Sequence, residues 1–499
     1  MRGRIPTLEL LVFAVGTSTL GAEIAAARLM APFFGDSTIV WANTIAIVLV
    51  ALSIGYWFGG RLADRHPHLR GLCLLVLAAS LLLGLVPIVA HPFLTLSVDA
   101  FDSVSIGTFA GSLFGVLALV AVPVLMLGAV SPWAIRLKLR AVEDSGETAG
   151  RMYAISTVGS LVGTFASSLL LIPLVGTHRT FLAFALVLAI VAALGGPRRW
   201  LLVPAGIAVL IAIPPGTIKA AEGATVLHEA ETEYQYARVV QDPDGERRLE
   251  LNEGQAIHSV WRPNTVLTGN YWDAFLVDPQ AALGRPPAKL AMLGTAAGTT
   301  ARAYQHYFPQ TTVDAVEIDG ELLDIGRRWF GLRPGPRLRL HTQDARPFLR
   351  STDERYDAIF VDAYRQPYIP FYLTTKEFFA LVRDRLNPGG VVAINIGHPE
   401  GSKRLEQVLT ATVGTAFDHV LRDPVAKVST VLLASNGPLS ATRLSNAALS
   451  MPADLRPLAE RTAARLAPGL RGGSVYTDDR APVEWLVDES IVSYAADGK

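Results

Sequence analysis

Acidic side chains in the C-terminal half of the chain follow short apolar runs of the kind that form buried strands. Glu317 lies in TVDAVEID, Asp344 follows LRLHTQ, and Asp362 follows YDAIFV. When such runs alternate with helices in a parallel sheet, ligands bind at the C-terminal ends of the strands. A single acidic residue there is more often a helix cap, but several in order favour a shared site. We therefore expect these carboxylates to converge.

A turn of small residues precedes these carboxylates. LGTAAGTTAR places Gly294 and Gly298 around a tight turn into a helix, although Ala296 occupies the middle glycine position. Small residues allow the backbone to approach a ligand, which the helix N-terminus then faces. Glu317 follows about 20 residues later, where a carboxylate accepts ribose hydroxyls, and Asp344 is placed to reach an adenine amino group. No basic residue accompanies the turn to anchor a phosphate, so the pattern favours an S-adenosyl nucleoside over a dinucleotide.

The elements that position these residues alternate between strands and helices. Strand-forming runs lie at 289–294, 312–319, 338–344, 356–364 and 389–397, and helical patterns lie at 299–308, 320–330 and 374–386. This alternation predicts a Rossmann-like α/β domain over 286–499, with a mostly parallel sheet and helices on both faces. Residues 224–285 begin with two strand-like runs around QDPDGE, which predicts a small β-hairpin region in front of that domain.

Residues 1–215 differ from the rest of the chain in composition. Hydrophobic residues make up 51% of the whole sequence and charged residues only 18%, and nearly all the long apolar runs lie in this part. A bilayer core needs about 20 apolar residues per helix. By that measure there are about seven candidates, at roughly 7–31, 38–60, 71–92, 108–135, 150–175, 178–195 and 199–215. Gly, Ala and Ser recur within them, which predicts a closely packed, multi-pass α-helical membrane bundle.

Charge limits the partners and the orientation. The 44 basic and 44 acidic residues cancel to a net charge of +0, so we expect no nucleic-acid partner. Basic residues gather in alternate loops and in the N-terminal tail, which places the N-terminus in the cytoplasm. Seven crossings would then leave the C-terminal domain outside. Because that domain needs an intracellular nucleotide, either one segment is miscounted, for example through an extra short or re-entrant element within 89–131, or the domain is external. We favour the miscount and expect a cytoplasmic domain on the cell (inner) membrane.

Two ionisable residues, Glu23 and Arg28, lie inside the first apolar segment. Such groups are costly at membrane depth and raise a transport or substrate-path hypothesis. The alternative is that they pair with each other or lie near an interface. The run GGRLADR at 59–65 resembles a loop of major-facilitator transporters, but seven segments are too few for that fold.

The block from Glu231 to Gly397 resembles the spermidine synthase (polyamine aminopropyltransferase) family, and its position after a membrane bundle resembles the membrane-fused members. TEYQ at 232–235 resembles the family's S-x-Y-Q, VEID and QDA match its nucleoside-binding segments, and VDAY matches the segment of its catalytic base. The resemblance implies that Asp362 is catalytic. The cofactor-binding residues that it implies are Gln235, Gly294, Gly298, Glu317, Asp344 and Ala345.

The resemblance also implies the reaction, which is transfer of an aminopropyl group from decarboxylated S-adenosylmethionine to an amine, as from putrescine to spermidine, with release of methylthioadenosine. Tyr271 falls where the family has an active-site tyrosine, and we place His258, Tyr364 and Arg365 with it as substrate-binding residues. We expect no metal. The expected partners are the lipid bilayer and a small-molecule amine or S-adenosyl substrate, and a homodimer is left open.

The role of Asp362 also follows from the chemistry of amines. An aliphatic amine has a pKa of about 10 and must lose a proton before it attacks the carbon next to a sulfonium. A carboxylate aimed at the amine holds the cation and takes the proton during the attack. Neighbouring aromatic faces stabilise both cationic partners.

Three positions depart from the family's amine-binding pattern. Ala297 and Arg365 stand where the family has acids, and Trp272 stands where it has Gln or His. An arginine beside Asp362 repels a diamine and suits a carboxylate, which favours a different acceptor or S-adenosylmethionine itself as donor. The alternatives are cleavage of S-adenosylmethionine, methyl transfer on the same site, or a transporter with a nucleoside-sensing domain. Three later acidic residues either restore acidity near the pocket or lie on an exposed loop: Asp478, Asp479 and Glu484.

Overall fold

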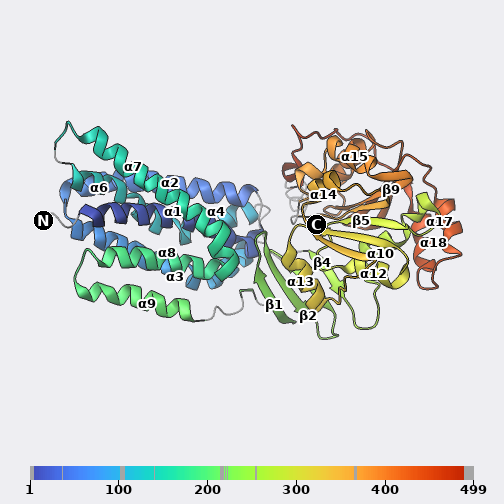
Figure 1. The fold of residues 1–499 in the computed structure, drawn as a ribbon, viewed down its shortest axis with the longest axis horizontal. Helices are drawn as coiled ribbons and strands as arrows, with labels where there is room; N and C mark the ends of the chain where they lie inside the picture. The colour runs from blue at the N-terminus through green and yellow to red at the C-terminus, as the bar shows by residue number, and fades with distance from the viewer. Residues whose placement is uncertain are drawn as a thin grey trace. The chain divides into compact units, whose positions relative to one another are not determined.

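The computed structural model of the chain describes residues 5–35, 38–101, 107–139, 141–213, 218–219, 221, 223–252, 256–364 and 368–487. It contains two compact units (Figure 1). The first comprises Met1–Ala220 with Glu229–Tyr236, and the second comprises Ala221–His228 with Ala237–Lys499. Each unit has a hydrophobic core of its own.

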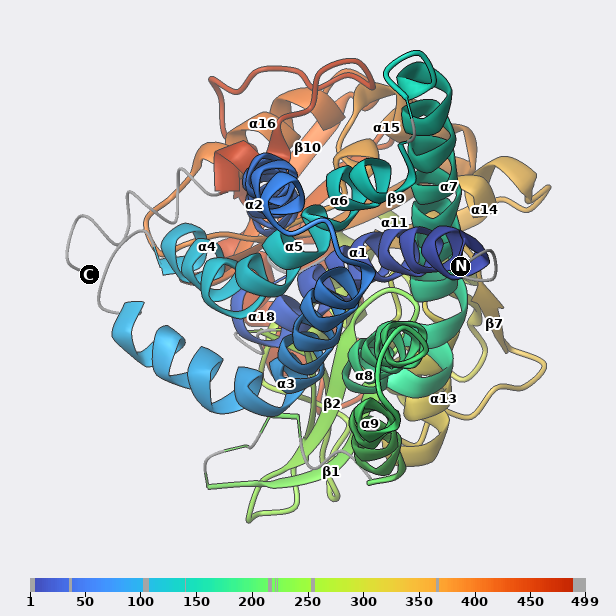
Figure 2. The same ribbon diagram turned by 90° about the vertical axis from the view of Figure 1, so that its left-hand side faces the viewer.

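The first unit is helical. Its helices are α1 (Ile5–Phe34), α2 (Thr38–Arg65), α3 (Leu69–Phe101), α4 (Gly107–Leu119), α5 (Ala121–Gly128), α6 (Val130–Lys138), α7 (Ser145–Phe165), α8 (Ile172–Ala193) and α9 (Leu202–Ala212). A π-helical turn, Ala166–Leu171, joins α7 to α8, and a 3-10 turn, Arg198–Leu201, precedes α9. Helix α1 contacts each helix from α2 to α8, and Figure 2 shows them gathered around it. The apolar segments therefore form one bundle.

Five stretches of described helix are long and apolar enough to cross a membrane: Leu8–Phe34, Thr38–Arg65, Leu69–Ser97, Ala121–Lys138 and Ser145–Ala193. The last stretch holds two of the expected segments, because Gly176, with φ 81°, interrupts the helical backbone within α8. The expected segment 199–215 contains α9, which has 11 residues.

The expected segment 108–135 is a run of three helices, α4 to α6. Val120 and Ala129, which separate them, keep right-handed helical backbone. Hydrogen bonds of helical spacing continue across both residues, from Val124 to Val120 and from Trp133 to Ala129. The run is therefore a single kinked path. The described residues within 89–131 include the shorter apolar helix Ala110–Leu119 beside the longer stretch Ala121–Lys138, so the expected extra short or re-entrant element stays a prediction.

Glycines allow α1 and α7 to pack closely. A Cβ at Gly16 would overlap the backbone of Ser156, and a Cβ at Gly159 would overlap that of Phe13. Any larger residue at either position would push the two helices apart. The small residues in the apolar segments thus serve helix packing, as predicted.

The second unit contains a mostly parallel sheet. A four-stranded sheet has the order β1-β2-β3-β4, and an eight-stranded sheet has the order β12-β10-β11-β9-β8-β5-β6-β7. The strands are β1 (Thr225–Glu231), β2 (Tyr236–Gln241), β3 (Arg247–Leu251), β4 (Ile257–Trp261), β5 (Lys289–Leu293), β6 (Thr312–Glu317), β7 (Leu338–Thr342), β8 (Tyr356–Val361), β9 (Leu386–Gly397), β10 (His419–Ala426), β11 (Ser429–Ser435) and β12 (Ala467–Pro468). Strands β9, β8, β5, β6 and β7 are parallel, and the strands at the other edge are antiparallel. The predicted Rossmann-like architecture is confirmed.

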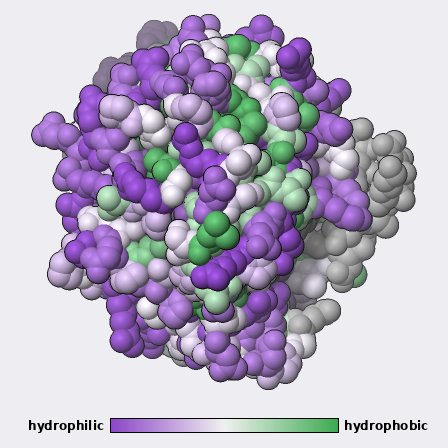
Figure 3. Space-filling model, turned by 90° about the vertical axis from the view of Figure 1, so that its right-hand side faces the viewer, coloured by the Kyte–Doolittle hydropathy of each residue, from purple (hydrophilic) through white to green (hydrophobic). Residues whose placement is uncertain are grey.

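Helices cover both faces of the larger sheet. They are α10 (Tyr271–Val277), α11 (Gln280–Leu283), α12 (Thr299–Tyr307), α13 (Gly320–Trp329), α14 (Ala345–Ser351), α15 (Lys376–Asp384), α16 (Arg404–Val413), α17 (Ala441–Ala448) and α18 (Arg456–Arg465). In β5, Leu290 and Met292 join the core with α10, α12 and α18, whereas Ala291 and Leu293 join the core with α14, α15 and α16. Alternate residues of a strand point to opposite faces, so each face has its own core. On the surface shown in Figure 3, hydrophilic side chains predominate.

Candidate active site

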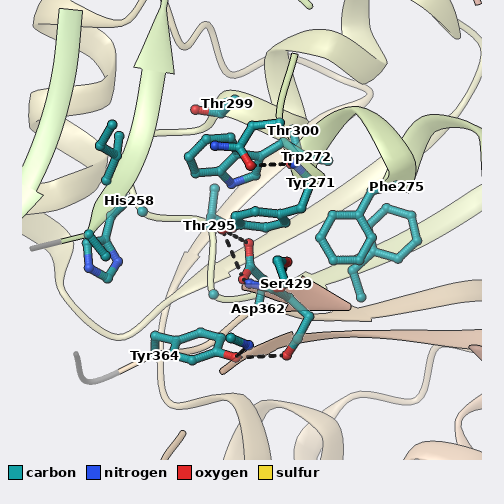
Figure 4. A pocket seen from close by; sticks show the side chains of 18 of the residues that line it. His258, Tyr271, Trp272, Phe275, Thr295, Thr299, Thr300, Asp362, Tyr364 and Ser429 are labelled. Carbon is teal, nitrogen blue, oxygen red and sulfur yellow. Dashed lines mark hydrogen bonds between the residues drawn. The ribbon is translucent and has the colours of Figure 1, made fainter. Parts of the chain in front are cut away.

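The C-terminal ends of the central strands line a cavity of about 540 Å³ in the second unit (Figure 4). This is the edge at which the strand pattern places a ligand. Residues of β4, α10 and α12 complete the lining. The polar and aromatic lining residues are His258, Asn270, Tyr271, Trp272, Phe275, Thr295, Thr299, Thr300, Phe360, Asp362, Tyr364, Asn395, His398 and Ser429.

Asp362 reaches the cavity because β5 and β8 are neighbours and end together. Its amide donates to the carbonyl of Leu293 at 2.8 Å. Gly294 follows with φ 86°, and a Cβ on it would lie 2.6 Å from Cα of Ala363. Glycine is the residue that tolerates both this backbone conformation and this close approach. The first glycine of the turn therefore lets the two strand ends come together.

The side chains of Tyr271, Asn395 and Trp272 hold the carboxylate of Asp362. The Tyr271 hydroxyl donates to its two oxygens at 3.1 and 3.3 Å, and Nδ2 of Asn395 donates to Oδ1 at 2.8 Å. The Ser429 hydroxyl donates to Oδ1 of Asn395 at 3.0 Å, which fixes the amide with its nitrogen toward Asp362. The carboxylate is thus oriented before any ligand binds.

The environment of Asp362 brings its titration close to neutral pH. Removal from bulk water raises its pKa to about 7, and the nearby charge of Glu317 acts in the same direction. Hydrogen bonds from Asn395 and Tyr271 lower the pKa and offset part of that rise. A group with such a pKa takes up and releases protons readily at neutral pH, which suits a general base.

Helix α10 supplies an aromatic wall beside Asp362. Oδ1 of Asn270 accepts the amide of Tyr271 at 2.8 Å and caps the helix start, and Asp273 accepts the amides of the two preceding loop residues Thr268 and Gly269. The rings of Tyr271 and Trp272 lie 4.5 Å apart at 33°. Burial and the charge of Asp362 raise the pKa of Tyr271, so the phenol remains a neutral donor.

The other predicted substrate-binding residues fall into two groups. Tyr364 lines the cavity, where its hydroxyl donates to the carbonyl of Asn395 at 3.0 Å and accepts the amide of Gly397 at 2.6 Å. His258 also lines the cavity, from β4. Arg365 lies outside the described residues.

Glu317 holds the glycine turn. Its Oε2 accepts the amides of Thr295 at 3.1 Å and Ala296 at 2.7 Å, and its Oε1 accepts the amide of Asp319 at 3.2 Å. Burial raises its pKa, and these amides offset the rise. Glu317 does not line the cavity. The two amides on Oε2 occupy both of its lone-pair directions, and Oε1 keeps one direction for a further donor, so the role of Glu317 as ribose ligand stays a prediction.

Asp344 caps α14. Its Oδ1 accepts the amide of Arg346 at 2.9 Å, and its Oδ2 accepts the hydroxyl of Tyr372 at 2.6 Å. Neither Asp344 nor the buried Ala345 lines the cavity. Contact with adenine therefore stays a prediction for both.

Gly298 and Gln235 have separate local roles. Gly298, with φ 90°, precedes α12, and a Cβ on it would lie 2.5 Å from Leu332. Gln235 is buried in the first unit, where its carbonyl accepts the amide of Thr232 at 2.8 Å. Its contact with a nucleoside stays a prediction.

Ala297 and Asp478, two positions considered for acceptor binding, do not line the cavity. Ala297 is fully buried in a cluster with Leu322, Ile325 and Phe330, so a side chain at this position packs into the core. Asp478 forms a bidentate pair with Arg346 at 2.6 and 2.8 Å, so it is committed elsewhere.

Two exposed or partly exposed acids of that later segment, Asp479 and Glu484, also lie outside the lining. Glu484 lies in the helical turn 483–487, whose last residue, Val487, lines the cavity. Restored acidity near the pocket therefore stays a prediction, whereas Asp478 and Asp479 lie in an exposed turn.

Asn395 and Ser429 are site residues that sequence reasoning missed. Asn395 lies near the end of GGVVAINIG, so a polar residue in an otherwise apolar strand was the available signal. Ser429 begins β11, an antiparallel strand whose pairing with β9 no local pattern indicates.

Comparison with known proteins finds relatives of part of the second unit. Residues 280–436 match the family model of the spermine/spermidine synthase domain. A probable polyamine aminopropyl transferase of Bifidobacterium longum is 33% identical over 193 residues, which are 38% of this chain and 42% of that protein. The human eEF1A lysine and N-terminal methyltransferase is 27% identical over 187 residues, 34% of this chain and 26% of that protein.

Among solved structures, a probable spermidine synthase from Corynebacterium glutamicum is similar with a TM-score of 0.39 and 21% identity, covering 50% of this chain and 97% of that one. The chain spans less than half the length of the two curated relatives described above. The family match and the sequence relatives agree with the resemblance seen in the motifs. Residues 280–436 of this chain are a spermine/spermidine synthase domain.

Proposed function

We propose that this chain is an aminopropyltransferase that uses decarboxylated S-adenosylmethionine and an amine and releases methylthioadenosine. The observation that carries the proposal is the carboxylate of Asp362, which Tyr271 and Asn395 hold at the wall of the cavity. Its position in a spermine/spermidine synthase domain supports the same reaction.

The proposed step begins with the protonated amine paired to Asp362. The carboxylate takes a proton from the ammonium, and the freed nitrogen lone pair attacks the carbon next to the sulfonium. A new C–N bond forms as the C–S bond breaks, and its electron pair goes to sulfur. The sulfonium becomes a neutral thioether, so the leaving group needs no acid. The aromatic faces of Tyr271 and Trp272 stabilise the two cations before they react.

We propose that the nucleoside of the donor lies along the glycine turn. In this arrangement the ribose hydroxyls approach Glu317, and the adenine approaches Asp344 and Ala345. The turn residues Gly294, Thr295 and Ala296 line the cavity, which supports it. Gln235 is the fourth proposed contact, from the segment that resembles S-x-Y-Q.

The acceptor end of the cavity fits a single cation. Among the lining residues that the structure describes, Asp362 is the only carboxylate. A diamine such as putrescine carries two ammonium groups, and each needs an acceptor. We therefore propose His258, Tyr271 and Tyr364 as contacts for an amine with one charged group near Asp362, and Arg365 for a neighbouring acidic group.

Methyl transfer from S-adenosylmethionine is the second candidate. The observation that favours it is the similarity to the human eEF1A lysine and N-terminal methyltransferase, because it covers 34% of this chain. A lysine acceptor is also an amine that a carboxylate can deprotonate, so Asp362 suits either reaction.

Product analysis separates the candidates. The purified chain is incubated with decarboxylated S-adenosylmethionine or with S-adenosylmethionine, each with putrescine, with a monoamine or with no amine. Methylthioadenosine that appears only with the decarboxylated donor and an amine is the expected result. S-adenosylhomocysteine would establish methyl transfer, and methylthioadenosine from S-adenosylmethionine alone would establish cleavage.

We propose that the helical unit is embedded in the cell membrane. Its five long apolar helices support this. Fractionation of expressing cells tests it: the chain should remain in the membrane pellet after carbonate washing and enter solution only with detergent.

A further inference from the structure

The loops at one end of the helical unit are basic. Lys138 and Arg151 both pair with Glu9, near the start of α1, and Arg136 pairs with Asp64, near the end of α2, at 3.1 Å. The basic residues of the three loops at this end include Arg65, Arg70, Lys138, Arg151, Arg198 and Arg199. We call this end of the unit the basic end.

The chain leaves the helical unit at the other end of α1. Nη2 of Arg28 donates to the carbonyl of Thr232 at 2.5 Å and to that of the next residue at 2.7 Å. Nζ of Lys219 donates to the carbonyl of Pro32 at 2.8 Å. At about 1.5 Å per residue, the stretch of α1 from Glu9 to Arg28 is about 28 Å long. That length is close to the thickness of the hydrocarbon core of a bilayer, about 30 Å.

Further contacts hold residues 229–236 at this exit end. Glu231 accepts the amide of Thr177, which follows the break at Gly176. Glu229 accepts the amides of Ile218 at 3.0 Å and of Lys219 at 2.9 Å. The linker and the start of β2 are thus tied to the end of the bundle that faces away from the basic loops. Arg28 has its place in this anchor, which argues against the substrate-path hypothesis for it.

The order of the helices agrees with these contacts. The run from α7 to Gly176 is parallel to α1, because Gly159 lies beside Phe13 and Ser167 beside Gly21. The run α4 to α6 is parallel to α2, because Ser112 lies beside Asn43 and Ala129 beside Gly59. With α1 and α2 joined by a short connection, these contacts give consecutive runs opposite directions. This alternation puts the three loops with several basic residues at the basic end, whereas the exit end has Arg28, Arg179 and Lys219. It puts the α1–α2 junction, Gly176 and the exit of α9 at the exit end.

We propose that the spermine/spermidine synthase domain lies outside the cytoplasm, on the side of the membrane opposite the basic loops. Loops rich in Lys and Arg face the cytoplasm. After Tyr236 no described helix is long and apolar enough to return across the membrane. This proposal replaces the expectation of a cytoplasmic domain, which rested on the need for an intracellular donor. The domain then takes its donor and acceptor from the outer side.

Single cysteines test the proposal by their position, independently of turnover. Cys73 is the only cysteine, and Cys73→Ala gives a background without a thiol. The exposed Asp353, in the synthase domain, and the exposed His66, in the α2–α3 loop, are each replaced by cysteine. Intact spheroplasts are treated with a membrane-impermeant maleimide, with and without detergent.

We expect the Asp353→Cys protein to label in intact spheroplasts at least about tenfold more than the His66→Cys protein, which labels fully only in detergent. The reverse pattern, or equal labelling of both in intact spheroplasts, would overturn the proposal. Protease treatment of the unaltered chain, with a C-terminal tag, is the second measurement, because it needs no substitution. Loss of the tagged domain in spheroplasts supports the outer side, and loss only in inverted vesicles contradicts it.

Discussion

Carboxylates on the two sides of the C-terminal edge of the larger sheet have different hydrogen-bond partners. On the side of β8 and β9, Asp362 faces the cavity and is held by neutral side chains, those of Tyr271, Asn395 and Trp272. On the side of β6 and β7, Glu317 and Asp344 accept backbone amides and lie outside the cavity lining. All three follow apolar strands in the sequence. The position of an acidic residue after a strand therefore predicts that it lies at this edge of the sheet. Its hydrogen-bond partners decide whether its carboxylate is available to a ligand.

Replacement of Asp362 gives the largest expected effect. Asp362→Asn keeps the hydrogen-bonding shape but removes the base, so kcat for methylthioadenosine formation should fall by about 10²- to 10⁴-fold. Steady-state assays of the purified chain measure it. Asp353→Asn, the same change on an exposed loop, should leave kcat unchanged. Full activity of the Asp362→Asn protein would remove Asp362 from the proposed role.

Loss of Asn395 should act through the pKa of Asp362. Its hydrogen bond lowers that pKa, so Asn395→Ala should raise it. From a pKa of about 7, a rise of one unit would lower the deprotonated fraction at pH 7 from about one half to about one tenth, so the rate would fall about fivefold, with recovery at higher pH. The pH profile of kcat/KM measures the shift. Asn387, whose amide donates to Asp357 at 2.9 Å outside the cavity lining, is the matched control as Asn387→Ala. An equal loss of kcat/KM at every pH would mean that Asn395 contributes to packing and does not lower the pKa of Asp362.

The strand order and the location of Asp362 could be predicted because they follow from local patterns. Apolar runs that alternate with helices fix a parallel sheet, and its C-terminal edge then contains the end of β8. The five strands expected in this region all occur. The neighbours of Asp362 could not be predicted in the same way. Ser429 and Asn395 meet through the antiparallel pair β9 and β11, whose residues are far apart in the chain.

The direction of individual side chains could not be predicted from the sequence either. Ala297 is one residue after Ala296, which lines the cavity, yet it points into the core. The acid at this position in the family motif suggested a ligand, but the direction depends on the left-handed backbone of Ala296, with φ 48°. The bundle shows the same limit. Its apolar segments were identified, whereas the continuation of α4 into α6 required the hydrogen bonds across Val120 and Ala129.

A substitution of Glu317 tests the role of the carboxylates on the side of β6 and β7. Glu317→Gln replaces one acceptor oxygen with a donor that faces a backbone amide, which should cost about 1–3 kcal/mol of the free energy of unfolding. Thermal unfolding of the variant in detergent measures this loss. Glu321→Gln, on an exposed position of α13, is the control and should unfold like the parent chain. An unchanged midpoint for Glu317→Gln, with a raised KM for the donor, would make Glu317 a ligand rather than a support of the turn.

The smallest expected effect concerns the backbone of the turn. Ala296 has φ 48°, a left-handed conformation that costs a non-glycine residue about 1–2 kcal/mol. Ala296→Gly relieves this strain but makes the unfolded chain more flexible, so we expect stabilisation by at most about 1 kcal/mol. Ala303→Gly in α12 should do the opposite, with a loss of about 1 kcal/mol. Unfolding midpoints of the two variants compare the signs, and destabilisation by both would contradict the account of the turn.

The pH dependence of a single turnover tests the role of Asp362 most directly. Excess enzyme with decarboxylated S-adenosylmethionine and its amine is quenched at intervals between pH 5.5 and 9, and methylthioadenosine is measured. Burial raises the pKa of Asp362 to about 7, so the protonated acid predominates below that pH and accepts no proton. The account predicts a rate that rises with pH and levels off above about 7 in the parent chain, and a slow rate without this inflection in Asp362→Asn. An inflection near 7 that persists in Asp362→Asn would contradict it.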